Sequence, residues 1–186
     1  QVDPNVLVPR PDTETVIEVA RSLRLDRAAS CSVLDLCTGS GCLAIVLAKT
    51  FTSAHVDAVD IDRRALAVAK RNVAAYRLQP RIRLARSDMF SALDGEHYDL
   101  IVANPPYVPA ATMLKLPREY RHEPRIALAG GRDGLDAVRV ILREAAGHLT
   151  ARGLLVVEVG HHRRRVERAF ADYPFVWPQT SGGDDC

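Results

Sequence analysis

The sequence lacks the features that mark several large classes of protein. Its 186 residues include only 5% aromatic residues and four cysteines, and no apolar run is long enough to span a bilayer. The cysteines follow no zinc-binding spacing, so we expect no metal and interpret them as packed, reduced thiols. A net charge of +2 is too small to predict a nucleic-acid-binding surface. Because no basic stretch followed by an apolar one begins the sequence, we expect a cytoplasmic protein.

The length and composition are typical of a globular domain with a full hydrophobic core. Hydrophobic residues make up 47% of the chain and charged residues 26%. Short apolar runs alternate with amphipathic stretches, which predicts an α/β fold whose parallel sheet is covered by helices on both faces. The expected strands are Ser32–Leu36, His55–Val59, Ile82–Ala85, Tyr98–Ala103 and Leu154–Val159, and the expected helices are Thr13–Leu25, Cys42–Thr50, Ala65–Tyr76, Asp136–Leu149 and Arg163–Tyr173.

The final residues have the pattern of an unfinished hairpin. Pro174–Trp177 reads as the beginning of a strand, and Ser181–Asp185 has the composition of a turn. A returning strand is expected after that turn, but the sequence ends at Cys186. We therefore expect the last strand of the sheet to be truncated.

Ligands of parallel α/β sheets bind beyond the carboxyl ends of the strands, so the residues after each expected strand are candidates for a site. The turn Gly39-Ser40-Gly41 follows the first strand and precedes a helix, where the backbone can approach a ligand closely. Asp60 follows the second strand, 19 positions after Gly41, and can accept hydrogen bonds from ribose hydroxyls. Asp62 fits better as the N-cap of the next helix. Together these features suit a dinucleotide or S-adenosylmethionine, and they do not choose between the two.

Two residues after the third expected strand could hold an adenine. The Asp88 carboxylate could accept a hydrogen bond from the adenine amino group, and the Met89 side chain could lie against the face of the ring. The alternative is an ordinary strand-to-helix loop that contains a buried Phe90.

The string Asn104-Pro105-Pro106-Tyr107 follows the fourth expected strand. The two prolines make the backbone rigid and direct its carbonyl groups and the Asn104 amide into the crevice. The Asn104 side-chain oxygen and the Pro105 carbonyl can each accept one N–H of a planar NH2 group. Such a nitrogen is a poor nucleophile, so the chemistry that this string predicts is orientation of the lone pair toward an electrophile.

These strings resemble a known family. Asn104–Tyr107 resembles the signature of S-adenosylmethionine-dependent methyltransferases that act on amino and amide nitrogens, and Asp35–Leu43 resembles their cofactor loop. Three further strings are similar to the protein glutamine methyltransferases of the HemK/PrmB group: Leu7–Glu14, Gly130–Leu135 and Glu158–Gly160. The resemblance implies a Rossmann-like, seven-stranded, class I S-adenosylmethionine-dependent methyltransferase fold.

The resemblance also implies roles for particular residues. Cofactor contacts fall on Thr38, Gly39, Ser40, Gly41, Cys42, Asp60, Ile61, Asp88, Met89 and Asn104. The catalytic site for the substrate amide falls on Asn104, Pro105, Pro106 and Tyr107. The substrate-loop residues are Pro9 and Arg10, in a segment that folds over the active site, together with Glu119, His122 and Glu123. His122 could accept a proton, and the alternative is a structural residue that holds the loop after Tyr107.

Two bacterial branches of this family differ in substrate. One methylates the Gly-Gly-Gln glutamine of peptide-chain release factors, and the other a glutamine of the third protein of the large ribosomal subunit. Leu116–Pro124, Cys37 and the closing Gly182-Gly183-Asp184 resemble the ribosomal-protein branch. The resemblance thus implies methyl transfer to the amide nitrogen of a glutamine in that protein. A release factor is the alternative substrate, and an adenine-specific DNA methyltransferase is a more distant alternative.

The family also suggests a domain division and leaves two features open. Residues 1–30 are expected to be the leading segment and helix that end a helical N-terminal domain, and residues 31–186 the catalytic domain. The basic cluster His161–Arg165 is interpreted as a solvated face, with contact to ribosomal RNA as the alternative. Glu158 could bind the substrate or brace a loop.

Overall fold

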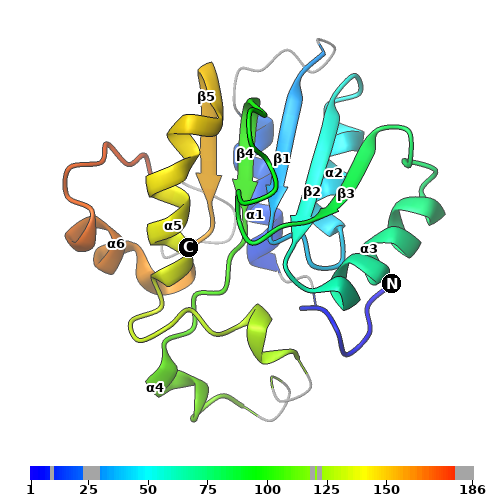
Figure 1. Ribbon diagram of the computed structural model, residues 1–186. Coiled ribbons are helices and arrows are strands. Elements are labelled where there is room, and N and C mark those ends of the chain that lie inside the picture. Colours follow the sequence, from blue (N-terminus) through cyan, green and yellow to red (C-terminus); the bar gives the residue numbers. More distant parts are fainter. Residues whose placement is uncertain (9–10, 23–29, 118–119, 121–122, 179–186) are drawn as a thin grey trace.

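The computed structural model describes residues 1–8, 11–22, 30–117, 120 and 123–178 (Figure 1). Pro9, Arg10, Glu119, His122 and the closing Gly182-Gly183-Asp184 therefore lie outside the described residues. What the sequence predicts for them stays a prediction.

The described residues form one five-stranded parallel sheet with the strand order β3-β2-β1-β4-β5. The α/β prediction is confirmed. The chain moves outward from β1 through β2 to β3, and then returns to the other side of β1 to form β4. This reversal opens a crevice at the carboxyl ends of β1 and β4. The strand bounds are Ser32–Leu36 for β1, His55–Asp60 for β2, Ile82–Arg86 for β3, Tyr98–Ala103 for β4 and Leu149–Val157 for β5.

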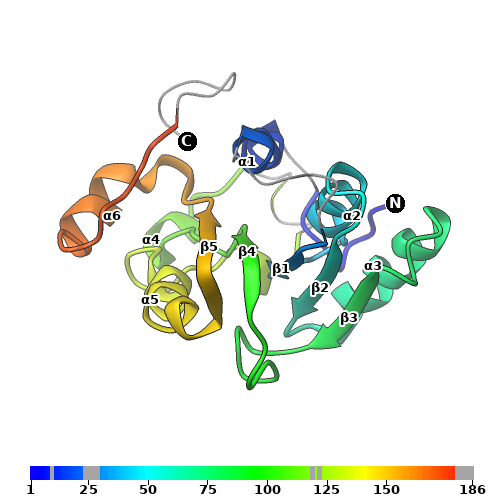
Figure 2. The same ribbon diagram turned by 90° about the horizontal axis from the view of Figure 1, so that it is seen from above.

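Helices cover both faces of the sheet, as Figure 2 shows. Side chains that alternate along each strand point to opposite faces, so Val33 of β1 joins the core with α1 and α2, while Leu34 joins the core with α5. The helix bounds are Pro11–Ser22 for α1, Cys42–Thr50 for α2, Arg63–Ala75 for α3, Ala110–Met113 for α4, Asp136–Glu144 for α5 and Arg163–Ala169 for α6. Short 3-10 turns follow at Arg125–Ala127, Ala145–His148 and Gly160–His162.

One strand prediction is wrong and another is misplaced. Pro174–Trp177 forms no strand. Its aromatic rings pack instead, with Phe175 between Tyr173 and Trp177 at centroid distances of 6.0 and 5.7 Å. The strand expected at Leu154–Val159 begins five residues earlier, at Leu149, because the preceding helical segment ends at His148. The described residues form five strands, so the two further strands that the fold class implies stay a prediction.

No helix within the described ranges is long and apolar enough to cross a membrane.

Candidate functional site

A cavity of about 260 Å³ lies at the carboxyl ends of β1, β2, β3 and β4. The fold brings ten of the predicted site residues together in its wall: Thr38, Gly39, Ser40, Cys42, Asp60, Ile61, Asp88, Met89, Asn104 and Pro106. Four other predicted residues that the structure describes, Gly41, Pro105, Tyr107 and Glu123, do not line it. The cavity wall also includes residues outside the predicted site, from two distant segments, Asn5–Leu7 and Pro124–Ala129.

Asp35 supports the turn Gly39-Ser40-Gly41 through hydrogen bonds on either side of it, although the sequence analysis did not single this residue out. Its Oδ2 atom accepts hydrogen bonds from Thr38 Oγ1 at 2.6 Å and from the Ala44 backbone N–H at 3.0 Å. Its Oδ1 atom is buried and has no hydrogen-bond partner among the described residues. Complete burial raises the pKa of the Asp35 carboxyl to about 7. The sequence did contain a signal for this role, because Asp35 is a charged residue inside an otherwise apolar strand.

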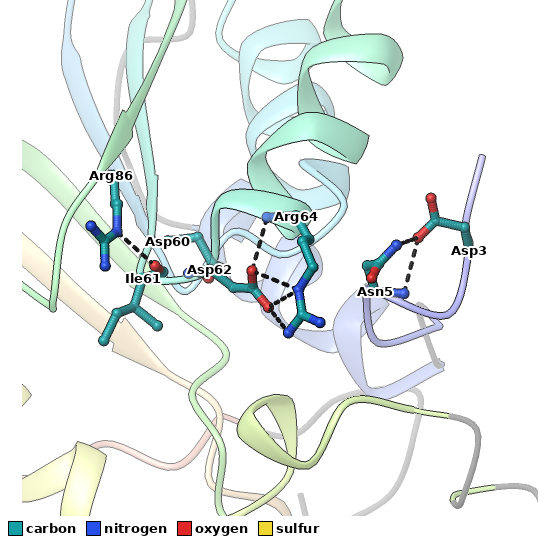
Figure 3. Close-up of polar contacts among 7 residues, drawn as sticks. All are labelled: Asp3, Asn5, Asp60, Ile61, Asp62, Arg64 and Arg86. Carbon is teal, nitrogen blue, oxygen red and sulfur yellow. Dashed lines mark hydrogen bonds and ion pairs between the residues drawn. The ribbon is translucent and has the colours of Figure 1, made fainter.

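Asp60 links the turn after β1 to the turn after β2. Its Oδ2 accepts the Gly39 N–H and its Oδ1 accepts the Asp62 N–H, both at 2.9 Å. Burial raises the pKa of Asp60, and the backbone donors oppose that shift. Asp62 caps α3 as predicted, because its side chain accepts the Arg64 N–H (Figure 3). On the other side, Arg86 donates to the Ile61 carbonyl at 3.1 Å, so the turn is held at both ends.

All charged side chains among the described lining residues of the cavity are negative. Asp60, Asp62 and Asp88 line it, and none of the described lining residues is Lys, Arg or His. The loop N–H groups of Thr38 and Gly39 are already bonded, to the Val59 carbonyl and to Asp60. A pyrophosphate would therefore meet carboxylates here rather than cationic side chains. The site suits a ligand that carries hydroxyls and positive charge.

Two sulfur-containing side chains meet at the apolar side of the cavity. Cys37 Sγ lies 3.9 Å from Met89 Sδ. Both residues have a left-handed backbone, with φ of 59° at Cys37 and 48° at Met89, which is uncommon outside glycine. Burial raises the pKa of the Cys37 thiol far above its ordinary value, so this thiol is neutral. Cys31, Cys37 and Cys42 are free thiols, as the sequence predicts.

Tyr107 is held outside the cavity by the segment that follows β5. Its hydroxyl donates to Glu158 Oε1 at 3.1 Å, and its carbonyl accepts a hydrogen bond from His162 Nε2 at 2.9 Å. The Glu158 backbone N–H also donates to the Ala103 carbonyl at 2.9 Å. Of the two roles that the sequence left open for Glu158, these contacts show that it braces the loop.

The glycines of two predicted strings make room for Tyr107. A Cβ atom at Gly160 would lie 2.8 Å from Tyr107 Cε2, and one at Gly134 would lie 2.5 Å from the Tyr107 carbonyl oxygen. Both glycines also have positive φ, 52° at Gly160 and 86° at Gly134. The strings Gly130–Leu135 and Glu158–Gly160 therefore each supply a glycine that leaves the space that Tyr107 occupies.

Glu123 lies at the boundary between the two distant segments of the cavity wall. The Val8 backbone N–H donates to Glu123 Oε1 at 3.4 Å and so joins the first residues of the chain to the segment after α4. Near the mouth, Ile126 and Val8 are 49% and 48% exposed, which leaves apolar surface beside the cavity.

The basic cluster at the start of α6 already makes contacts within the chain. Arg163 forms an ion pair with Glu167 at 3.1 Å and lies 5.2 Å from the centroid of the Trp177 ring. Arg165 donates to the Asp133 carbonyl. Contact between this cluster and ribosomal RNA stays a prediction.

Known proteins resemble this chain at two levels. In sequence, this chain is 52% identical over 190 residues to a protein of Bordetella pertussis named ribosomal protein uL3 glutamine methyltransferase. The match covers 99% of this chain and 62% of that protein. A protein of the same name from Neisseria meningitidis is 54% identical over 153 residues, covering 82% of this chain and 50% of that protein. The resemblance expected from the motifs is confirmed. The chain spans between half and two thirds of the length of these relatives.

Solved structures show the fold. The ribosomal protein L11 methylase from Lactobacillus delbrueckii matches with a TM-score of 0.61 and 22% identity, over 90% of this chain and 70% of that one. The hMettl16 catalytic domain matches with a TM-score of 0.62 and 19% identity, over 78% of this chain and 56% of that one. These matches confirm the fold of class I S-adenosylmethionine-dependent methyltransferases. A sequence model of the methyltransferase small domain matches residues 19–116, more than half of the chain. The chain belongs to the methyltransferase small domain family.

Proposed function

We propose that this protein transfers a methyl group from S-adenosylmethionine to the side-chain amide nitrogen of a glutamine in ribosomal protein uL3. One observation carries the proposal: a cavity with acidic residues and no described basic residue in its wall is also lined by Asn104, the first residue of the Asn-Pro-Pro-Tyr string. The names of the relatives from Bordetella and Neisseria support the same reaction and the same substrate.

The residues of the cavity fit S-adenosylmethionine. Asp60 would accept hydrogen bonds from the ribose hydroxyls, since each of its oxygens uses one lone pair on a backbone N–H and keeps another. Ile61 and Met89 supply apolar surface for the adenine, and Asp88 supplies an acceptor for its amino group. When bound, S-adenosylmethionine supplies a methyl group on a positively charged sulfur.

The substrate amide would be oriented by acceptors of this chain. The Asn104 side-chain oxygen and the Pro105 carbonyl each accept one N–H of the glutamine amide, which directs the nitrogen lone pair toward the cavity. The amide proton becomes acidic only after the nitrogen is alkylated, so no strong base is needed before attack. The contribution of the protein is orientation and fixed dipoles rather than covalent chemistry. Pro9, Arg10, Glu119, His122 and Glu123 would form the substrate-contacting segment over this site.

The charge of the cavity argues against a nicotinamide-dependent oxidoreductase, the alternative that shares the glycine turn and Asp60. Such an enzyme binds a pyrophosphate, which the three lining carboxylates would repel. It would also have no use for Asn104 and Tyr107. A release factor or an adenine in DNA could use the same amide site, and these two substrates are outcomes of the test below.

The test uses the full-length protein and S-adenosylmethionine with a labelled methyl group. Unmethylated uL3, release factor and adenine-containing DNA are offered separately, with the Asn104→Ala variant as the matched control. Label on uL3 that is lost in the variant supports the proposal. Label on the release factor alone would keep the chemistry and change the substrate, and label on DNA alone would refute action on a protein.

A further inference from the structure

The two central residues of the Asn104–Tyr107 string supply no backbone hydrogen-bond donors. Pro105 and Pro106 have no N–H, and their rings fix φ near –65°. The string therefore moves nearly as one unit, and its orientation depends on what binds its carbonyl groups and its two ends. The string begins directly after Ala103, the last residue of β4, and ends before α4.

The segment Glu158–His162, which follows β5, holds both ends of this unit. At the first end the Glu158 N–H donates to the Ala103 carbonyl at 2.9 Å. At the second end His162 Nε2 lies 2.9 Å from the Tyr107 carbonyl oxygen. Because a carbonyl oxygen can only accept, His162 must carry its proton on Nε2.

The peptide plane after Tyr107 is held on both edges. Its carbonyl oxygen accepts from His162, and its N–H, which belongs to Val108, donates to the Leu128 carbonyl at 2.8 Å. Loss of the His162 bond would remove one of these two contacts. Rotation of the plane would turn the rigid Pro105–Pro106 unit and displace the acceptors that face the substrate amide.

The surroundings of His162 favour this role over simple filling of space. The ring is half-buried and meets the Tyr107 ring edge-on, with centroids 6.2 Å apart and planes at 76°. A Cβ atom at Gly134 would lie 3.3 Å from His162 Nε2, so the glycine leaves the space in which the imidazole reaches the Tyr107 carbonyl. Burial and the nearby Arg165 lower the pKa of His162, which keeps the ring neutral with one N–H to donate.

We propose that His162 is a positioning residue for the amide site, which acts by donating a hydrogen bond from Nε2 to the Tyr107 carbonyl. The proposal rests on the proposed function for its catalytic consequence. The contact itself is independent of that function. His162 does not line the cavity, so its effect should fall on the transfer step and not on cofactor affinity.

Two substitutions separate the hydrogen bond from the packing. His162→Leu fills a similar space without a donor, whereas His162→Gln can place an amide N–H near the position of Nε2. The exposed neighbour His161 offers the matched control, His161→Leu. All variants are made in the full-length protein.

The first measurement is amide hydrogen exchange, which needs no activity. We expect Val108 to exchange about fivefold faster in His162→Leu, as the loss of one hydrogen bond allows, and near the original rate in His162→Gln and His161→Leu. Unchanged exchange at Val108 in His162→Leu would overturn the proposal. Equally fast exchange in the Leu and Gln variants would also overturn it, because the ring and not the bond would then matter.

The second measurement is methyl transfer to uL3. We expect His162→Leu to lower kcat roughly 10- to 100-fold, with the Kd for S-adenosylhomocysteine unchanged and substantial recovery in His162→Gln. An unchanged kcat in His162→Leu would overturn the positioning role. If the unsubstituted protein transfers no methyl group to uL3, the proposed function fails, and the exchange rate of Val108 still decides whether His162 holds the string.

Discussion

The buried Asp35 carboxyl makes the stability of the folded chain depend on pH. Its pKa is raised from 3.8 to about 7 by burial, so the folded state binds a proton that the unfolded state has already released between those two values. Folding stability from this group therefore falls as pH rises from about 4 to 7 and is constant above that. Each pKa unit is worth about 1.4 kcal/mol, so the full penalty reaches about 4 kcal/mol at alkaline pH.

Asp35→Asn removes this penalty, because the amide keeps an acceptor for Thr38 and Ala44 but never ionises. Any free-energy cost of burying the uncharged amide is the same at every pH. The free energy of unfolding of the variant minus that of the original chain should therefore rise by about 2–3 kcal/mol between pH 5 and pH 8.

Urea unfolding at several pH values, followed by circular dichroism, measures this difference directly. Substitution of an exposed carboxylate, Asp94→Asn, is the control for loss of one charge. A difference that stays flat across the range would refute the assignment of a raised pKa to Asp35, and a falling difference would reverse its sign.

Three further predictions concern the cavity and its supports. Asp60→Ala removes the acceptor of two backbone N–H groups, and we expect roughly 30-fold weaker binding of S-adenosylhomocysteine by titration calorimetry; equal affinity would exclude Asp60 from the ligand site. In the same calorimeter NADH should not bind measurably, since none of the described lining residues is basic, and tight binding would contradict our reading of the charge. Gly160→Ala should destabilise the chain by about 1–3 kcal/mol in urea unfolding, because the new Cβ would meet the Tyr107 ring and because residue 160 has a φ of 52°, which strains an alanine. Unchanged stability would show that the loop can change its conformation at little cost.

The sheet and most of the cavity could be predicted from the sequence. Tyr98–Ala103 is buried on both faces, so it reads as a continuous apolar run with recognisable ends. Once the sheet is known to be parallel, the residues after β1, β2, β3 and β4 must meet at one edge. That is why Gly39, Asp60, Met89 and Asn104 come together as expected.

The remaining features depend on contacts between distant parts of the chain. The strings that resemble the family include Leu7 and Pro124, but nothing local in Asn5, Val6 or Ile126–Ala129 indicates that these residues complete the cavity wall. Tyr107 has the residue type of a substrate contact, but its hydroxyl bonds to Glu158, 51 positions away, and this keeps it from lining the cavity. The strand prediction for Pro174–Trp177 was wrong because the aromatic rings there pack on one another. Such packing requires no hydrogen-bonded neighbouring strand.

The central claim is that the acceptors at Asn104 direct methyl transfer to a glutamine side chain. Fragment-ion mass spectrometry of uL3 treated with the full-length protein and S-adenosylmethionine tests it most directly. We predict one methyl group on the side-chain amide nitrogen of a single glutamine, absent with Asn104→Ala although that variant still binds S-adenosylhomocysteine. A methyl group on another type of side chain, or full methylation by the Asn104→Ala variant, would contradict the claim.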